Sequence, residues 1–207
     1  MTTVNRRTVC AALLAAGILA ACEKSSVAGI SVGKYKGLDV SGGKYDTTTL
    51  QGLDAAGKTR TLAEFEGKVV ALFFGFTSCP DVCPTTLQEM RQVKRLLGDK
   101  ADQLQVVFVS IDPERDKPEL LKQYMEAFDP SFLGLQPDPE VLRTRIAPAF
   151  KVYYNKVPSS DGKAYTMDHS AGVYLLDTKG KMRLHENYGA KPEDVAHDIQ
   201  LLLQEKA

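Results

Sequence analysis

The chain lacks a hydrophobic run long enough to cross a bilayer, which takes about 20 apolar residues. It also lacks an excess of charge, because 26 basic residues are balanced by 26 acidic ones. No stripe of basic residues interleaves with aromatic ones, which argues against a nucleic-acid-binding protein. The length of 207 residues and the apolar share of 43% suit one globular domain with extra segments at its ends.

The N-terminal segment has the pattern of an export signal. Arg6 and Arg7 precede a short apolar run, Val9 to Ala21, that ends in small residues. The run finishes as Leu19-Ala-Ala-Cys22, which resembles the lipobox of bacterial lipoproteins. We therefore predict a lipoprotein signal peptide over residues 1–21 and a lipid on Cys22, although an exported cysteine can also enter a disulfide.

The stretch after the signal is rich in Gly, Ser and Lys and has no regular apolar period. Such a composition is typical of a flexible tether, which we place at residues 22–44. The folded domain is accordingly predicted over residues 45–207.

Cysteine is scarce, with four in the whole chain. Cys10 leaves with the predicted signal and Cys22 is committed to lipid, so only Cys79 and Cys83 remain available. In an oxidising compartment, two nearby cysteines form a disulfide, a redox couple or a metal site.

Apolar periodicity from residue 45 onward predicts alternating strands and helices. An N-terminal hairpin is followed by the order β-α-β-α-β-β-α, which is the thioredoxin-like order. The predicted fold class is therefore α/β, a thioredoxin-like three-layer sandwich with an added N-terminal β-hairpin. The predicted strands cover 47–53, 58–62, 69–76, 104–111, 171–176 and 181–187, and helices begin near Pro84, Pro118, Asp138 and Pro192, the third ending before Pro148.

The cysteine pair lies where a buried strand gives way to a helix, the usual place for sites in α/β sheets. Cys83 directly precedes Pro84, so we predict that it lies near the helix N-cap with a lowered thiol pKa. A pair of thiolates is a soft site suited to copper(I) or zinc. A structural disulfide would close too short a loop to stabilise much. Three residues separate these cysteines, against two in thioredoxin-type enzymes, and spacing alone leaves metal and redox roles open.

A histidine favours the metal role. His169 precedes the predicted strand 171–176. In a thioredoxin-like fold the loop that enters this strand faces the cysteine motif, and thioredoxin-type enzymes carry a cis-proline there. No proline occurs between Pro158 and Pro192, so an imidazole there completes a two-sulfur, one-nitrogen set for copper. Asp168 is predicted to orient the His169 ring.

The remaining candidate ligands have weaker support. His185, on a predicted edge strand, and His197, on the polar side of the last helix, are predicted to be solvated. A thioether copper relay is disfavoured because the methionines occur at core spacings, namely Met90, Met125 and Met182.

Three motifs together resemble the SCO/SenC copper proteins: Phe74-Gly-Phe-Thr-Ser-Cys-Pro-Asp-Val-Cys-Pro-Thr-Thr-Leu87, Val109-Ser-Ile-Asp-Pro-Glu-Arg-Asp116 and Asp168-His-Ser170. The resemblance implies copper, as Cu(I) or Cu(II), bound by Cys79, Cys83 and His169. It further implies delivery of copper to, or thiol reduction of, the binuclear copper site of cytochrome c oxidase subunit II, with another periplasmic copper carrier as a second partner. For the stretch from Asp112 to Asp116 we favour a helix cap over a docking site.

We therefore expect an exported copper metallochaperone on the periplasmic face of a bacterial membrane, with the inner membrane favoured. Oxidation to a Cys79–Cys83 disulfide would release the metal, because a disulfide offers no thiolate. The alternatives are a periplasmic thiol-disulfide oxidoreductase that uses the same cysteines, and a structural lipoprotein with an inert disulfide.

Overall fold

Two apolar runs form the centre of the fold. In the computed structural model, which describes residues 34–205, β4 (Val69–Gly75) and β5 (Leu104–Ser110) are parallel neighbours. Alternate side chains of β4 enter different apolar clusters, because successive residues of a strand point to opposite faces. Val69, Ala71 and Phe73 face one cluster, and Val70, Leu72 and Phe74 face the other.

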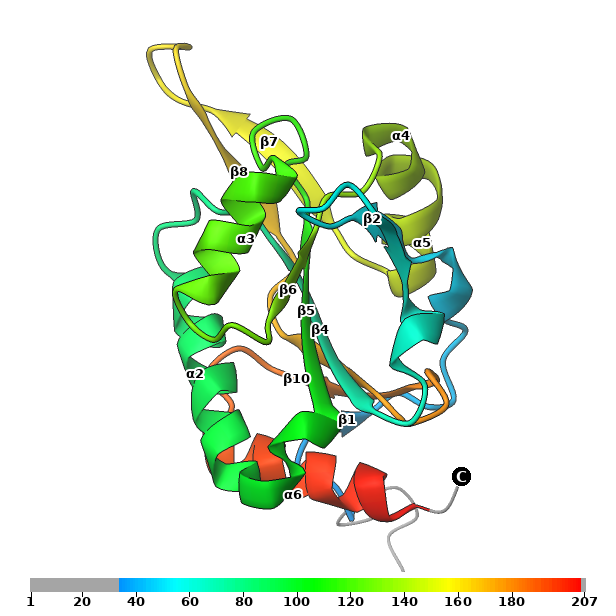
Figure 1. Ribbon diagram of the computed structural model, residues 1–207. Coiled ribbons are helices and arrows are strands. Elements are labelled where there is room, and N and C mark those ends of the chain that lie inside the picture. The colour runs from blue at the N-terminus through cyan, green and yellow to red at the C-terminus, as the bar shows by residue number, and fades with distance from the viewer. Residues whose placement is uncertain (1–33, 206–207) are drawn as a thin grey trace, which may run out of the picture. The chain divides into compact units, whose positions relative to one another are not determined.

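These two strands belong to a mixed sheet of six strands (Figure 1). β6 pairs parallel with β5, whereas β9 pairs antiparallel with β4, β10 with β9 and β1 with β10. The strand order is β1 (Leu38–Asp39), β10 (Met182–Glu186), β9 (Val173–Leu176), β4, β5 and β6 (Leu133–Leu135).

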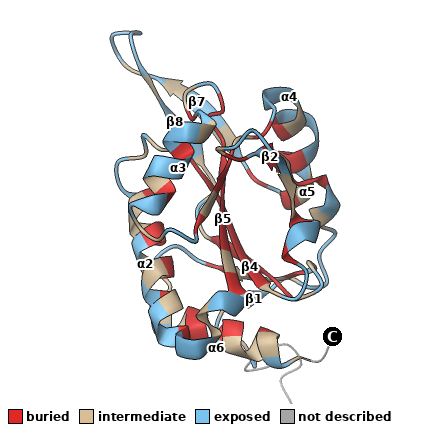
Figure 2. Ribbon diagram, in the orientation of Figure 1, coloured by how far each residue is buried: buried red, intermediate tan, exposed pale blue. Residues whose placement is uncertain are grey.

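Three helices cover one face of the sheet: α2 (Val82–Leu97), α3 (Pro118–Glu126) and α6 (Pro192–Gln204). Each presents an apolar stripe to the strands, and Leu87, Leu121 and Ile199 are completely buried there. Figure 2 shows these buried stripes against the sheet, with exposed residues on the outer sides of the helices. A 3-10 turn, η3 (Gly98–Gln103), connects α2 to β5.

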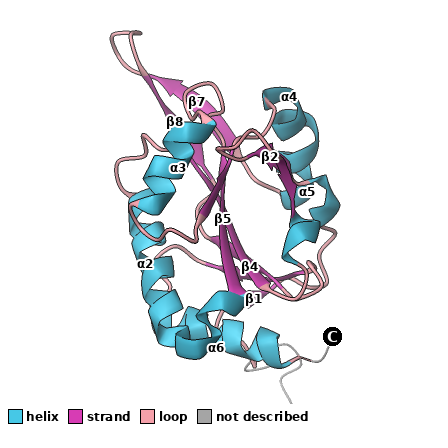
Figure 3. Cartoon of the chain, in the orientation of Figure 1, coloured by secondary structure: helices cyan, strands magenta, loops and turns pink. Residues whose placement is uncertain are grey.

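The other face is covered by shorter elements (Figure 3). The predicted N-terminal hairpin is present as β2 (Gln51–Leu53) and β3 (Thr59–Thr61), between the 3-10 turns η1 (Thr47–Thr49) and η2 (Leu62–Phe65). A helical segment packs beside it and is built from α4 (Pro139–Val141), η4 (Leu142–Ile146) and α5 (Ala147–Phe150). The three layers confirm the predicted thioredoxin-like sandwich with an added hairpin.

The helical segment differs from its prediction at its end. Asp138 caps it as expected, accepting hydrogen bonds from the amides of Glu140 and Val141. The helix was predicted to stop before Pro148, but it continues through this proline to Phe150. Pro148 is tolerated because η4 is a π-type turn after which α5 begins, so the proline lies in a first turn that needs no amide donor.

A second hairpin projects beyond the main sheet, as Figure 1 shows in yellow. Its strands β7 (Tyr154–Pro158) and β8 (Tyr165–His169) pair antiparallel with each other and form a two-stranded sheet of their own. The sequence pattern predicted no strand in this region.

The folded unit begins at Tyr35, ten residues before the predicted boundary at Tyr45. The completely buried carboxylate of Asp198 accepts hydrogen bonds from the backbone amides of Lys36 and Gly37, and β1 then pairs with β10. The tether predicted over residues 22–44 therefore ends earlier than expected. The predicted signal peptide and Cys22 lie outside the described residues.

A buried glutamate, Glu186, makes the stability of the fold depend on pH. Its side chain is buried near Asp198, and burial, followed by the Asp198 charge, raises the pKa of Glu186 from 4.5 to about 7. Between these values the unfolded chain ionises this group while the folded protein keeps it protonated, so rising pH destabilises the fold. We predict that wild type loses on the order of 3 kcal/mol relative to Glu186→Gln from about pH 4.5 to about pH 7.

Chemical denaturation of both proteins across this pH range measures the difference. The exposed Glu66→Gln should follow the wild-type profile. Parallel stability curves for wild type and Glu186→Gln would contradict the prediction.

Candidate metal centre

The carboxyl end of β4 carries the cysteine motif. After Gly75 the chain turns through residues 76–81, and α2 begins at Val82. The amide of Cys79 donates to the carbonyl of Phe76 at 3.2 Å, which folds this loop back toward the helix. Both cysteines are free thiols, Cys83 buried and Cys79 partly exposed.

Cys83 lies inside the first turn of α2, with its sulfur against the end of β4. A Cβ atom placed on Gly75 would lie 2.6 Å from the Cys83 sulfur and 2.8 Å from the Phe108 ring. Only glycine at position 75 therefore leaves room for this sulfur without a shift of the backbone. The role of Gly75 has no sequence signal of its own, because packing against a sulfur leaves no local pattern.

The Cys79 sulfur lies over the N-terminus of α2, where it accepts the Cys83 amide at 3.4 Å. The thiol of Cys83 also donates to it, and this is the main reason that the pKa of Cys79 falls to about 3. Donation to Cys79, together with burial, raises the pKa of the Cys83 thiol. The prediction that Cys83 has the lowered pKa is wrong, because α2 begins at Val82 and the amide and thiol of Cys83 both donate to the Cys79 sulfur.

His169 is the last residue of β8 and brings an imidazole to the two sulfurs. Its Nε2 lies 3.9 Å from the Cys83 sulfur, and its ring meets the Phe76 ring edge-on at a centroid distance of 5.9 Å. Its Nδ1 lies 2.8 Å from the carbonyl oxygen of Ser170. A carbonyl only accepts, so Nδ1 carries the proton of the neutral ring, and Nε2, which faces the two sulfurs, is the nitrogen left to bind an ion.

The surroundings of His169 act in opposite directions on its charge. Burial lowers the pKa of this imidazole, but the Cys79 sulfur and the Ser170 carbonyl outweigh burial and raise the pKa overall. The raised pKa means that the Cys79 thiolate favours the protonated, positively charged form of the ring.

Asp168 does not have the position predicted for it. Neighbouring residues of a strand point to opposite faces, so the Asp168 side chain leaves the side of β8 on which His169 meets the cysteines. Asp168 is exposed, and the hydrogen bond that fixes the ring is made by the backbone of Ser170.

The structure brings Cys79, Cys83 and His169 together, with their ligand atoms within 4.8 Å of one another. Metal–thiolate bonds are about 2.3 Å and metal–imidazole bonds about 2.0 Å, so atoms bound to one ion lie roughly 4 Å apart. A small inward movement of these side chains closes the set around an ion. Two thiolates and one imidazole are donors that copper accepts.

The other two histidines have different surroundings. His197 is exposed and contacts Asp198, as predicted for the polar side of α6. The prediction that His185 is solvated on an edge strand is wrong, because β1 pairs with the outer side of β10. The His185 ring also meets the Tyr174 ring edge-on, with 4.9 Å between the ring centroids. Burial lowers the pKa of His185. The predicted core methionines are buried: Met90, Met125 and Met182.

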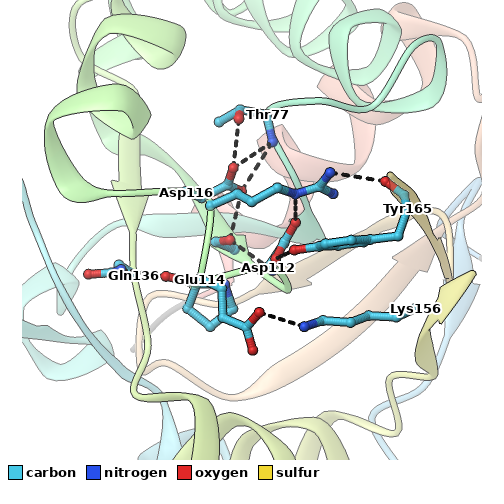
Figure 4. A network of polar contacts seen from close by, with 10 residues as sticks. Thr77, Asp112, Glu114, Asp116, Gln136, Lys156 and Tyr165 are labelled. Atoms are coloured by element: carbon cyan, nitrogen blue, oxygen red, sulfur yellow. Dashed lines mark hydrogen bonds and ion pairs between the residues drawn. The ribbon is translucent and has the colours of Figure 1, made fainter. Parts of the chain in front are cut away.

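The stretch from Asp112 to Asp116 is not the helix cap that we favoured. The residue that precedes α3 is Lys117, and no side chain caps this helix. Asp116 is completely buried and accepts hydrogen bonds from Thr77 and Ser110 instead (Figure 4). The sequence alone does not predict this buried role, because an aspartate before a helix normally indicates a cap.

The fold and this cluster define a thioredoxin-like protein whose cysteine pair faces an imidazole. The SCO1/SenC family model matches residues 41–204, and the chain belongs to this family. An SCO2-like protein of Rickettsia felis is 35% identical over 144 residues, covering 69% of this chain and 70% of that protein.

Two solved structures extend the comparison. ScoI of Bradyrhizobium japonicum with copper bound has a TM-score of 0.67 and 42% identity, covering 73% of this chain and 96% of that one. An SCO1/SenC family lipoprotein of Bacillus anthracis has a TM-score of 0.66 and 26% identity, covering 78% and 96% of the two chains. Within residues 34–205, none of the helices combines the length and apolarity that crossing a bilayer requires.

The asymmetry of the two thiols leads to a prediction about their reactivity. Since the pKa of Cys79 is about 3, this residue is a thiolate at about pH 5, where an ordinary cysteine is protonated. We predict that iodoacetamide at about pH 5 alkylates Cys79 and leaves the buried Cys83 unmodified. Peptide mass spectrometry identifies the modified residue.

Cys83→Ala removes the main donor to Cys79 and should move the ultraviolet thiolate transition to higher pH. Preferential alkylation of Cys83, or a thiolate transition unchanged in Cys83→Ala, would contradict this assignment of the two thiols.

Proposed function

We propose that this protein is a copper metallochaperone whose ligands are Cys79, Cys83 and His169. The observation that supports the proposal is the convergence of these three donor groups within 4.8 Å on an otherwise thioredoxin-like scaffold. We further propose that its recipient is the binuclear copper site of cytochrome c oxidase subunit II, and that a second periplasmic copper carrier supplies the metal.

The unequal burial of the ligands suits delivery. Cys83 is completely buried and anchors one side of the site, whereas Cys79 and His169 are only partly covered. A thiolate or imidazole of a partner protein therefore approaches on the side of Cys79 and His169. Copper then moves by stepwise exchange of ligands between the two proteins, which requires no chemical turnover.

The cell position that we propose follows from the N-terminal sequence. A lipid on Cys22 would attach the chain to the periplasmic face of the bacterial inner membrane. The residues between Cys22 and Tyr35 then separate the folded unit from the membrane surface. The lipoprotein of Bacillus anthracis supports this anchor, since it is a relative of similar fold.

Thiol-disulfide exchange is the second candidate function, favoured by the lowered pKa of the accessible Cys79. Its thiolate would attack a disulfide of a partner protein and release one thiolate of that partner. The Cys83 thiol would then lose its proton and attack Cys79, which releases the second partner thiolate and leaves a Cys79–Cys83 disulfide. The same step would reduce the copper-binding cysteines of a recipient.

Copper titration of the reduced protein separates these functions. We predict one tightly bound copper ion for each chain. Loss of a residue that only supports a metal ligand typically weakens metal affinity by roughly 10–100-fold. His169→Ala removes a ligand itself, so it should weaken the copper affinity by more than this. Competition with a copper(I) chelator gives the affinity, and the exposed His197→Ala serves as a matched control.

Equal copper affinity in wild type and His169→Ala would overturn the three-ligand site. Disulfide reduction that persists in His169→Ala, together with negligible copper binding by wild type, would instead establish the oxidoreductase.

A further inference from the structure

The two segments that carry the candidate ligands belong to different sheets. Cys79 follows β4 of the main sheet, whereas His169 ends β8, which within residues 34–205 pairs with β7 in a separate two-stranded sheet. The chain returns to the main sheet after His169, where β9 pairs with β4, but no strand pairing in this described part of the chain holds β8 itself against the cysteine loop. Side-chain contacts through the loop between β5 and α3 connect the two segments (Figure 4).

On the cysteine side, Asp116 holds the loop that contains Cys79. Its carboxylate accepts the backbone amide of Thr77 at 3.1 Å and the Thr77 hydroxyl at 2.6 Å. Thr77 lies two positions before Cys79. The Ser110 hydroxyl at the end of β5 also donates to Asp116, at 2.7 Å, so this carboxylate ties the cysteine loop to the main sheet.

On the histidine side, Arg115 and Asp112 hold β8 through Tyr165. The Tyr165 hydroxyl donates to the buried Asp112 carboxylate at 2.9 Å. The Arg115 guanidinium lies 3.8 Å from the centroid of the Tyr165 ring and donates to the Tyr165 carbonyl at 3.0 Å. Arg115 also donates through Nε to Asp112. Tyr165 precedes His169 by four positions on the same strand.

The Ser110 hydroxyl and the Arg115 guanidinium connect the cysteine side of this network to the histidine side. Asp112 donates its backbone amide to the Ser110 hydroxyl at 3.0 Å, and that hydroxyl donates to Asp116. Arg115 also lies 5.8 Å from the centroid of the Phe76 ring, which contacts the His169 ring. The guanidinium therefore contacts both a residue of the cysteine loop and a residue of the histidine strand.

We propose that Asp112, Arg115 and Asp116 are positioning residues that set the distance between His169 and the two cysteines. The inference rests on the proposed copper site and explains how this chain holds it together. Asp112 and Asp116 are 1% and 0% exposed, so they act inside the fold and do not offer a docking surface. Rigid support of this kind is what keeps metal ligands in productive geometry.

The loop between β5 and α3 also contacts the β7–β8 hairpin through an exposed ion pair, which provides a matched control. Lys156 of β7 contacts Glu114 of the loop at 2.6 Å, but these side chains are 45% and 63% exposed. Exposed ion pairs contribute little to the stability of a fold. Glu114→Gln therefore removes an exposed contact between this loop and the hairpin and leaves the side chains of Asp112, Arg115 and Asp116 unchanged.

The test compares copper(I) affinity in wild type, Arg115→Gln, His169→Ala and the double variant. We expect Arg115→Gln to weaken binding by about tenfold or more, and Glu114→Gln to leave it unchanged. Because Arg115 acts through His169, adding Arg115→Gln to His169→Ala should change the affinity by less than about twofold.

A second readout needs no copper. In the metal-free protein, the nuclear Overhauser contact between the Phe76 and His169 rings should be lost in Arg115→Gln and kept in Glu114→Gln. Thermal unfolding monitors the fold of each variant. If Arg115→Gln does not fold, Tyr165→Phe replaces it, since this change removes only the hydroxyl bonded to Asp112.

Unchanged affinity and an unchanged ring contact in a folded Arg115→Gln would overturn the positioning role, while copper binding by wild type would keep the proposed function. An equal loss of affinity in the presence and absence of His169 would also overturn it, because Arg115 would then act independently of the imidazole. Failure of wild type to bind copper would end the proposed function and the inference with it.

Discussion

The first turn of α2 determines what the two sulfurs can do. Because the helix begins at Val82, the Cys83 sulfur points into the core beside Gly75, while the Cys83 amide and thiol both face Cys79. One cysteine is therefore a partly exposed thiolate and the other a buried donor. An ion that replaces the shared proton between them would meet two sulfurs whose positions the fold has already fixed, and His169 lies at the open side of that pair.

The imidazole depends on a less regular part of the structure. Its hairpin is separate from the main sheet, and its contacts with the cysteine loop run through the loop that follows β5. The copper transfer that we propose requires a site that holds the ion and also releases it. A site in which the sulfurs belong to a rigid core, while the imidazole belongs to a hairpin held by side chains, fits both needs. The same asymmetry leaves Cys79 accessible for disulfide exchange.

The sequence was sufficient to predict four strands of the main sheet (β4, β5, β9 and β10), its helices and the three candidate ligands, for reasons that are local. Continuous apolar runs gave β4 and β5, and Pro192 marked the start of α6. β6 was missed because three residues with a central glycine carry little pattern, and β7 and β8 because they lie mostly outside the core. Pro84 suggested a later helix start, which assigned the lowered pKa to the wrong cysteine. The partner of the His169 ring is a backbone carbonyl, and side-chain identity carries no information about it.

X-ray absorption spectroscopy at the copper edge tests the shared site most directly, because it counts the atoms bound to the ion. Copper-loaded wild type is predicted to show two sulfur neighbours at about 2.3 Å and one nitrogen neighbour at about 2.0 Å, with the nitrogen absent in His169→Ala. A copper ion bound by two sulfurs alone, with the same spectrum in wild type and in His169→Ala, would contradict the account.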